Sequence, residues 1–199
     1  MKIGIYGGSF DPPHIGHINA CRAFFKAYNF DKLFVIPVFV PPHKTLKSKV
    51  TTDQRLHMSR LAFESISQNV EISDLEIKRQ GKSYTAETIR FFKENYSADI
   101  YFLCGTDMLL TLDSWYKPEY IFENATIVYM RRENNPEITR QISDKISLYK
   151  QKYGAKINCL KSQIIEVSST IVRNTIKKDT VKRYLPSVLY KYIIENDLY

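Results

Sequence analysis

Two histidines follow a glycine pair near the start of the chain. The segment reads Gly7-Gly8-Ser9-Phe10-Asp11-Pro12-Pro13-His14-Ile15-Gly16-His17. His14 and His17 are three positions apart, so both would lie on one face of a helix's first turn, where exposed N–H groups favour an anion. Glycines before that turn let a ligand approach the main chain closely, and we expect Gly16 to remove a side chain that would crowd the ligand. The segment predicts hydrogen-bond donors aimed at phosphate oxygens.

Each of these features also has a plainer explanation. A glycine pair after a strand is most often only a turn, and histidines at positions i and i+3 can be half of a metal site or ordinary surface residues. Their combination at the end of one strand favours phosphate binding. Two other residues stay open: Asp11 as a turn-former only, and Arg55 as a phosphate contact or a cover for a helix face.

Two further polar segments follow expected strands. Gly105-Thr106-Asp107 ends the apolar run 100–104, and Ser168-Ser169-Thr170-Ile171-Val172-Arg173 follows residues 163–167. Ligands of parallel α/β sheets bind outside the carboxyl ends of the strands. We therefore expect residues 105–107 and 168–173 to meet the histidine segment.

The elements that must position these segments alternate between strand and helix. Expected strands cover residues 2–6, 33–38, 70–72, 100–104, 125–130 and 163–167. Expected helices cover residues 15–29, 52–67, 84–95 and 136–152, with two more beginning near 168 and 186. This alternation predicts an α/β fold with a doubly wound, mostly parallel, Rossmann-like sheet. Its 199 residues suit a single domain, in which residues 168–199 form a small helical C-terminal part.

Composition narrows the class of protein. The net charge of +8 suits polyanions, either nucleic acid or triphosphate nucleotides, and no run of five basic residues marks a nucleic-acid tail. No apolar run approaches the roughly 18–20 residues of a membrane span, and residues 1–6 lack signal-peptide features. We expect a cytoplasmic protein. Cys21, Cys104 and Cys159 are far apart and are expected to be buried free thiols.

The motifs resemble those of a known family. Residues 14–17 are similar to the His-x-Gly-His signature of the nucleotidyltransferase superfamily, and residues 168–173 to the Ser-Ser-Thr-x-x-Arg signature of its smaller members. Gly81-Lys82-Ser83-Tyr84-Thr85, then Gly105-Thr106-Asp107, then Trp115 resemble the bacterial nicotinate-mononucleotide adenylyltransferases over nearly the whole chain. The chain departs from that family at 131–136, where members often have Arg-Pro-Gly.

The resemblance implies adenylyl transfer from ATP to nicotinate mononucleotide in NAD biosynthesis, with in-line attack and no covalent intermediate. It implies catalytic roles for His14, His17, Lys44 and Arg173. The implied ATP-binding residues are Gly7, Gly8, Ser9, Phe10, His14, His17, Gly105, Asp107, Ser168, Ser169, Thr170 and Arg173. The implied acceptor-binding residues are Lys44, Ser83, Tyr84, Thr85, Asp107 and Trp115. Mg²⁺ would arrive with ATP, since no carboxylate cluster suggests a metal site made by the protein alone.

Several alternatives stay open. The acceptor could be nicotinamide mononucleotide or phosphopantetheine, as in sister enzymes. A different class is a nucleic-acid-binding module on the same fold, although the intact signatures favour an enzyme. Trp115 could be an ordinary core residue, and Asp107 a helix N-cap. We expect ATP and nicotinate mononucleotide as partners, with no nucleic acid and no membrane, and leave homo-oligomerisation open.

Overall fold

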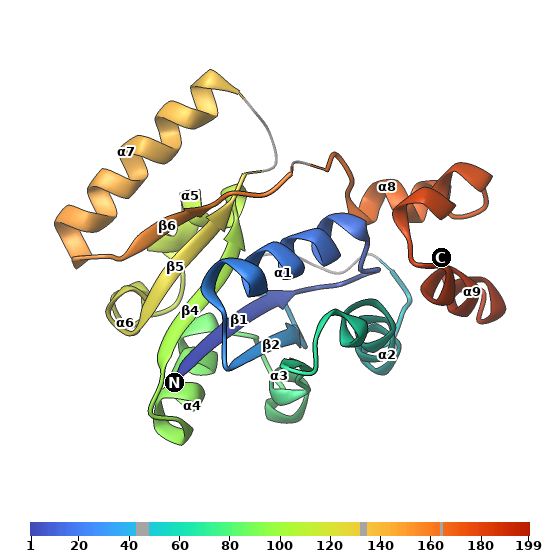
Figure 1. Ribbon diagram of the computed structural model, residues 1–199, viewed down its shortest axis with the longest axis horizontal. Helices are drawn as coiled ribbons and strands as arrows, with labels where there is room; N and C mark the ends of the chain where they lie inside the picture. Colours follow the sequence, from blue (N-terminus) through green and yellow to red (C-terminus); the bar gives the residue numbers. More distant parts are fainter. Residues whose placement is uncertain (43–47, 132–134, 164) are drawn as a thin grey trace.

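The fold is built on one parallel sheet (Figure 1). The computed structural model describes residues 1–42, 48–131, 135–163 and 165–199. The strands within these residues are β1 (Lys2–Gly8), β2 (Lys32–Pro37), β3 (Val70–Ile72), β4 (Asp99–Gly105), β5 (Ala125–Met130) and β6 (Ile157–Leu160). They lie in the order β3-β2-β1-β4-β5-β6, and every neighbouring pair is parallel. The strand order therefore reverses between β1 and β4, which is where such sheets bind ligands.

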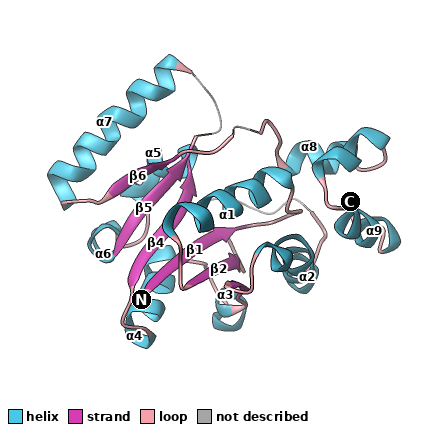
Figure 2. Cartoon of the chain, viewed as in Figure 1, coloured by secondary structure: helices cyan, strands magenta, loops and turns pink. Residues whose placement is uncertain are grey.

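Helices cover both faces of this sheet (Figure 2). They are α1 (Ile15–Tyr28), α2 (Thr52–Phe63), α3 (Leu75–Arg79), α4 (Thr85–Asn95), α5 (Thr106–Thr111), α6 (Pro118–Asn124), α7 (Pro136–Tyr153), α8 (Ser169–Thr175) and α9 (Ser187–Glu195). The 3₁₀ helices in the described part of the chain are η1 (Glu64–Ile66), η2 (Leu112–Ser114) and η3 (Asp179–Tyr184).

Alternate residues of each central strand enter different hydrophobic clusters. Leu33 and Val35 of β2 pack with residues of α1, α2, α8 and α9, whereas Phe34 and Ile36 pack with residues of α4 to α7. This division follows from strand geometry, because successive side chains point to opposite faces. A strand buried on both faces needs a continuous apolar sequence, which β2 has. The prediction of a doubly wound α/β sheet is confirmed.

The last strand lies earlier than predicted. We expected residues 163–167, but β6 is Ile157–Leu160, which pairs with β5 through Ile127 and Ile157. This edge strand exposes two of its four side chains, so its sequence is less apolar than that of a central strand. Cys159 is one of the exposed pair, which makes the expectation of a third buried thiol wrong, while Cys21 and Cys104 are buried.

The C-terminal residues pack on the same side as α1. Residues 169–195 contain α8, η3 and α9, and their buried side chains include Val172, Val181 and Leu189 in the cluster shared with α1 and α2. None of the helices that the structure describes is both long and apolar enough to cross a lipid bilayer.

Candidate active site

Two pockets open side by side at the carboxyl ends of β1 and β4. The first has a volume of about 460 Å³ and the second about 370 Å³. Both are lined by Gly7, Gly8, Ser9, Gly105 and Met108, so they meet where the strand order reverses. Such a pair of adjoining cavities can hold two substrates with their reactive ends together.

The two histidines lie in the wall of the first pocket. His14 is the N-cap of α1, and its Nδ1 accepts a 3.4 Å hydrogen bond from the His17 N–H group. The imidazole rings stack with 3.7 Å between centroids and 23° between planes. An acceptor at Nδ1 places the proton of a neutral His14 ring on Nε2. The start of α1 thus combines imidazole groups with the positive end of a 14-residue helix.

The Phe10 ring packs against the His17 side of this histidine pair. It is only 1% exposed, and its ring lies edge-on to His17 with 5.3 Å between centroids and packs against Phe63 at 5.2 Å. Its φ of 45° is in the left-handed region, which a bulky residue adopts only when packing compensates for the strain. A Cβ on Gly8 would lie 2.7 Å from the Phe10 ring, so Gly8 makes room for that ring.

Gly16 has a different role from the one expected. A Cβ at this position would lie 3.0 Å from Val167 Cγ1 and 3.1 Å from His14 Cε1. The space beside Gly16 is therefore occupied by protein atoms, and the expectation that it clears room for a ligand is wrong. Gly16 instead allows the His14 ring to lie against the first turn of α1.

The second signature is tied to the first by direct hydrogen bonds. The Ser169 hydroxyl donates to the Pro12 carbonyl oxygen at 2.8 Å. Arg173 Nη1 donates to the Asp11 carbonyl oxygen, and its Nη2 donates to Thr170 Oγ1 at 3.2 Å. The contacts with Pro12 and Asp11 each span more than 150 residues of sequence. They bring an arginine and three hydroxyl residues to the pocket that the histidines line.

Arg55 is buried below the histidine segment. Its side chain is 1% exposed and donates to the carbonyl oxygens of Ser9 at 3.0 Å and Phe39 at 3.3 Å. Burial lowers the pKa of the guanidinium, and the nearby Asp11 carboxylate opposes that shift. Arg55 therefore does not cover an exposed helix face, and it lines neither pocket. Its hydrogen bonds instead hold the loops that follow β1 and β2.

The second pocket contains aromatic rings and a helix start. Ser83 is buried: its N–H donates to the Val40 carbonyl oxygen at 2.9 Å, and its hydroxyl accepts from the Phe39 N–H at 2.9 Å. The Tyr84 ring lies 4.5 Å from that of Tyr116. Thr85 is the first residue of the 11-residue helix α4, whose N-cap makes no side-chain hydrogen bond. The N–H groups at this helix start favour a negatively charged group in the pocket.

Glu76, which sequence reasoning missed, lies behind this helix start. It is 5% exposed, it lines the second pocket, and its Oε1 accepts from the Thr88 hydroxyl at 2.6 Å. Burial raises the pKa of this carboxyl and so favours its neutral form, although the hydrogen bonds from Thr88 and Ser83 oppose the shift. A neutral acid repels an anionic ligand less than a carboxylate would.

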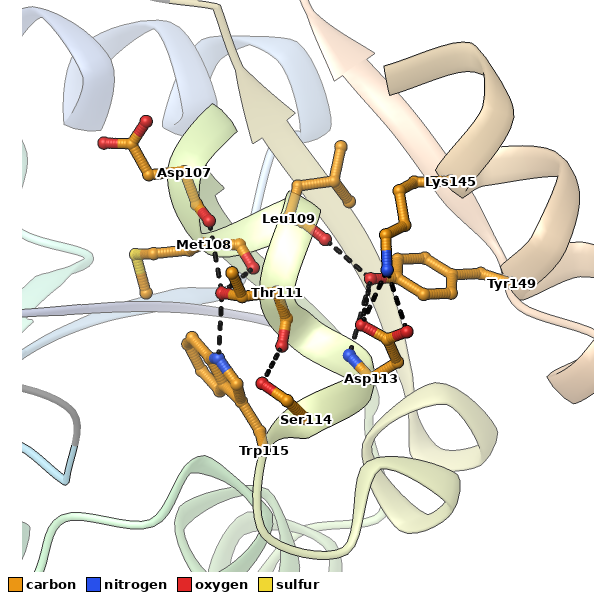
Figure 3. Close-up of polar contacts among 9 residues, drawn as sticks. All are labelled: Asp107, Met108, Leu109, Thr111, Asp113, Ser114, Trp115, Lys145 and Tyr149. Atoms are coloured by element: carbon orange, nitrogen blue, oxygen red, sulfur yellow. Dashed lines mark hydrogen bonds and ion pairs between the residues drawn. The ribbon is translucent and has the colours of Figure 1, made fainter. Parts of the chain in front are cut away.

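Trp115 is held at the rim of the second pocket by the preceding helical turn (Figure 3). Its Nε1–H donates to Thr111 Oγ1 at 3.3 Å, and its ring lies edge-on to Phe102 at 6.4 Å. It is half-buried and packs against the core while also lining the pocket, and its contact with the acceptor stays a prediction. Asp107 is an exposed first-turn residue of α5 that lines the second pocket, and the N-cap is Gly105.

Helix α7 anchors the segment that carries Trp115. Lys145 Nζ lies 2.9 and 3.1 Å from the carboxylate oxygens of Asp113, and the buried Tyr149 hydroxyl lies 2.9 Å from Asp113 Oδ1 and from the Leu109 carbonyl oxygen (Figure 3). Burial raises the pKa of Asp113, but hydrogen bonds from Lys145 and Tyr149 outweigh burial and hold it below its usual value. The polar region after residue 136 thus supports the wall of the second pocket.

We expect Lys145→Met to destabilise the fold by about 1 kcal/mol at neutral pH, as for a favourable, partly exposed ion pair. Because the folded-state pKa of Asp113 is depressed, its stabilisation is complete above the ordinary value of 3.8 and is lost as pH falls through the folded-state value. Urea unfolding from pH 7 to pH 3 should show the difference from the wild type shrinking. Lys150→Met, an exposed lysine of the same helix, is the control. A gap that is constant with pH would contradict this assignment.

The structure separates the predicted residues between the two pockets. The first is lined by Gly7, Gly8, Ser9, Phe10, His14, His17, Gly105, Ser168, Ser169, Thr170 and Arg173. The second shares Gly7, Gly8, Ser9 and Gly105 with the first and is further lined by Ser83, Tyr84, Thr85, Asp107 and Trp115. Asp107, which was predicted for both substrates, lies with the acceptor group. Lys44 lies outside the described residues. So do residues 132–134, which belong to the segment 131–136 where the sequence differs from the family pattern.

The donors of the first pocket suit phosphate better than a bare cation. Its wall carries imidazole, guanidinium and hydroxyl groups, with Asp11 as the carboxylate. That carboxylate is already hydrogen bonded to Ser48 and Tyr199. Among the described residues, no group of three or more His, Cys, Asp or Glu side chains could hold a metal ion.

Comparisons with known proteins agree with this geometry. A family model described as cytidylyltransferase-like matches residues 5–175. A protein of Clostridium botulinum strain Kyoto, named "Probable nicotinate-nucleotide adenylyltransferase", is 38% identical over 98% of this chain and 97% of its own. A protein of the same name from Lachnoclostridium phytofermentans is 32% identical over 100% and 98%. The structure of Plasmodium falciparum nicotinic acid mononucleotide adenylyltransferase complexed with NaAD matches with a TM-score of 0.74 and 18% identity, over 98% of this chain and 96% of that one.

The chain belongs to the cytidylyltransferase-like family. Its predicted resemblance to the nicotinate-mononucleotide adenylyltransferases is confirmed by relatives of that name that match it over nearly their whole length.

Proposed function

We propose that this protein transfers the adenylyl group of ATP to nicotinate mononucleotide, giving deamido-NAD and pyrophosphate. The observation that carries the proposal is the pair of pockets joined at the ends of β1 and β4. One pocket is lined with phosphate-binding groups, and the other with aromatic rings and the start of α4. The names of the full-length relatives support the same reaction.

In the first pocket the protein acts by positioning and by charge. An oxygen of the acceptor phosphate attacks the α-phosphorus of ATP in line, and the bond to the bridging oxygen of pyrophosphate breaks. Phosphoryl chemistry of this kind needs little covalent participation by protein. His14 and His17 donate to the ATP phosphates, with His17 nearest the reacting centre. Arg173 and residues 168–170 hold the β- and γ-phosphates as they leave.

In the second pocket Trp115 stacks on the pyridine ring. The N–H groups around Thr85 at the start of α4 receive the ring carboxylate, and burial of Glu76 behind them disfavours a second negative charge there. An amide would present its NH₂ group to the same donors and leave polar groups unpaired. This pocket therefore favours the acid over the amide. Asp107 contacts ribose hydroxyls.

Two parts of the proposal rest on the resemblance. Lys44, outside the described residues, binds phosphate where the two substrates meet. Mg²⁺ enters with ATP, because this cation prefers oxygen ligands and is commonly held through substrate phosphates. When bound, it would neutralise charge on the phosphate oxygens.

Replacing Trp115 by alanine should raise KM for nicotinate mononucleotide about tenfold while kcat and KM for ATP change little, because stacking on the ring contributes about 1–2 kcal/mol. Steady-state kinetics with each substrate varied in turn measures this. Phe91→Ala removes a 38%-exposed aromatic ring on α4 and serves as the control. An unchanged acceptor KM in Trp115→Ala would remove this residue from the site.

The reaction itself is tested by incubating the protein with ATP, Mg²⁺ and nicotinate mononucleotide. We expect equimolar pyrophosphate and a dinucleotide product. Retardation of RNA at moderate salt without pyrophosphate release would instead favour a nucleic-acid-binding module.

A further inference from the structure

A buried carboxylate joins the two signatures to the residues after α9. Asp11 is 3% exposed, and sequence reasoning had assigned it no more than a turn. Its carboxylate accepts from the Ser48 hydroxyl at 2.8 Å and, through Oδ1, from the Tyr199 hydroxyl at 2.7 Å. Asp11 and Tyr199 are 188 positions apart in sequence. Asp11 is thus where residues from distant parts of the chain meet.

Arg173 contacts Asp11 at two places. Its Nη1 donates to the Asp11 carbonyl oxygen and lies 3.8 Å from Oδ2, the carboxylate oxygen opposite the one that Tyr199 contacts. The Arg173 side chain is 21% exposed and that of Asp11 is 5% exposed, so this pair is poorly screened by solvent. The orientation of the guanidinium in the phosphate pocket therefore depends on where the Asp11 carboxylate is held.

The Tyr199 hydroxyl is a permanent donor to that carboxylate. Burial raises the pKa of the phenol, and the adjacent Asp11 charge raises it further, so the hydroxyl keeps its proton at working pH. The hydroxyl also lies 3.9 Å from Met58 Sδ of α2. The preceding residue, Leu198, is 7% exposed in the cluster shared with α1. Packing therefore holds this segment against the histidine loop.

From these contacts we propose that Tyr199 is a positioning residue for the nucleotide site. By fixing one oxygen of Asp11, it keeps the other oxygen and the main chain of the loop in place for Arg173, and so tunes affinity for the triphosphate. Tyr199 lines neither pocket, so it acts through Asp11 and touches no substrate. The inference rests on the proposed use of the first pocket by ATP.

The test is Tyr199→Phe, which keeps the ring and removes only the hydroxyl. We expect the Kd for α,β-methylene-ATP, measured by calorimetry, to rise about tenfold, as for loss of a hydrogen bond to a charged group. The KM for ATP should rise in parallel, and the KM for nicotinate mononucleotide should stay within about twofold of wild type. Tyr192→Phe is the matched control, because this tyrosine of α9 packs in the same cluster, against His57.

A purely structural role would lower the melting temperature without separating the two substrates. The inference is overturned if Tyr199→Phe binds the analogue as tightly as the wild type or Tyr192→Phe does, or if both KM values rise equally. A failure of the proposed adenylyl transfer itself would give a different result. In that case the wild type itself would neither bind α,β-methylene-ATP nor release pyrophosphate.

Discussion

Replacing His17 by alanine lowers kcat by about 10²-fold or more, because a donor to the transition state contributes on the order of 3 kcal/mol. The ring is aimed by its stacking on His14 at 3.7 Å and by the edge of Phe10 at 5.3 Å. Since the donor acts mainly as charge develops, KM for ATP should change much less than kcat. Steady-state pyrophosphate release at saturating substrates measures the effect.

The control for this variant is His57→Ala, which removes an exposed histidine of α2 that packs on Tyr192. Its kcat should stay within about twofold of wild type, since its ring lines neither pocket. Circular dichroism establishes that both variants are folded. A folded His17→Ala enzyme with near-normal kcat would exclude His17 from the chemistry.

Replacing Arg55 by alanine should lower the free energy of unfolding by about 3–5 kcal/mol. The change removes one of the positive charges near the Asp11 carboxylate, removes the donors to Ser9 and Phe39, and empties the space of a side chain that is 1% exposed. Urea unfolding at pH 7 measures the difference. Remaining folded enzyme should also have a lower kcat, because the Ser9 loop precedes the histidines.

Arg60→Ala is the matched control on the same helix. Arg60 is about half exposed, and its ion pair with Glu64 has a separation of 4.0 Å, so we expect a change of about 0.5 kcal/mol or less. Equal destabilisation by the two substitutions would show that Arg55 is no more than another helix-surface arginine.

The sequence predicted the strands of the sheet that are buried on both faces, because such strands consist almost entirely of apolar residues. Residues 33–37 are apolar because β2 is covered on both faces, and the same holds for residues 100–104 of β4. The edge strand β6 has no such signature because Asn158 and Cys159 are exposed. Helix α5 was missed for another reason. It is only six residues long, too short for a helical period to stand out.

The residues that line the pockets could also be predicted in part from the sequence. Segments at the ends of parallel strands meet whatever their separation in sequence, so residues 7–17, 105–107 and 168–173 could be grouped in advance. The support beneath them could not be predicted. Asp11 and Tyr199 are joined by a hydrogen bond between single side chains across the whole chain, and neither residue type indicates its partner. Glu76 likewise owes its altered acidity to burial, which a sequence does not give.

Pyrophosphate release with ATP and three acceptors in parallel tests the proposed reaction most directly: nicotinate mononucleotide, nicotinamide mononucleotide and phosphopantetheine. We predict the highest kcat/KM with nicotinate mononucleotide, a lower value with the amide, and no turnover with phosphopantetheine, which lacks the carboxylate and the pyridine ring that the second pocket is proposed to bind. Equal or faster turnover of the amide or of phosphopantetheine would contradict the assignment of the second pocket, and no release with any acceptor would contradict the proposed reaction.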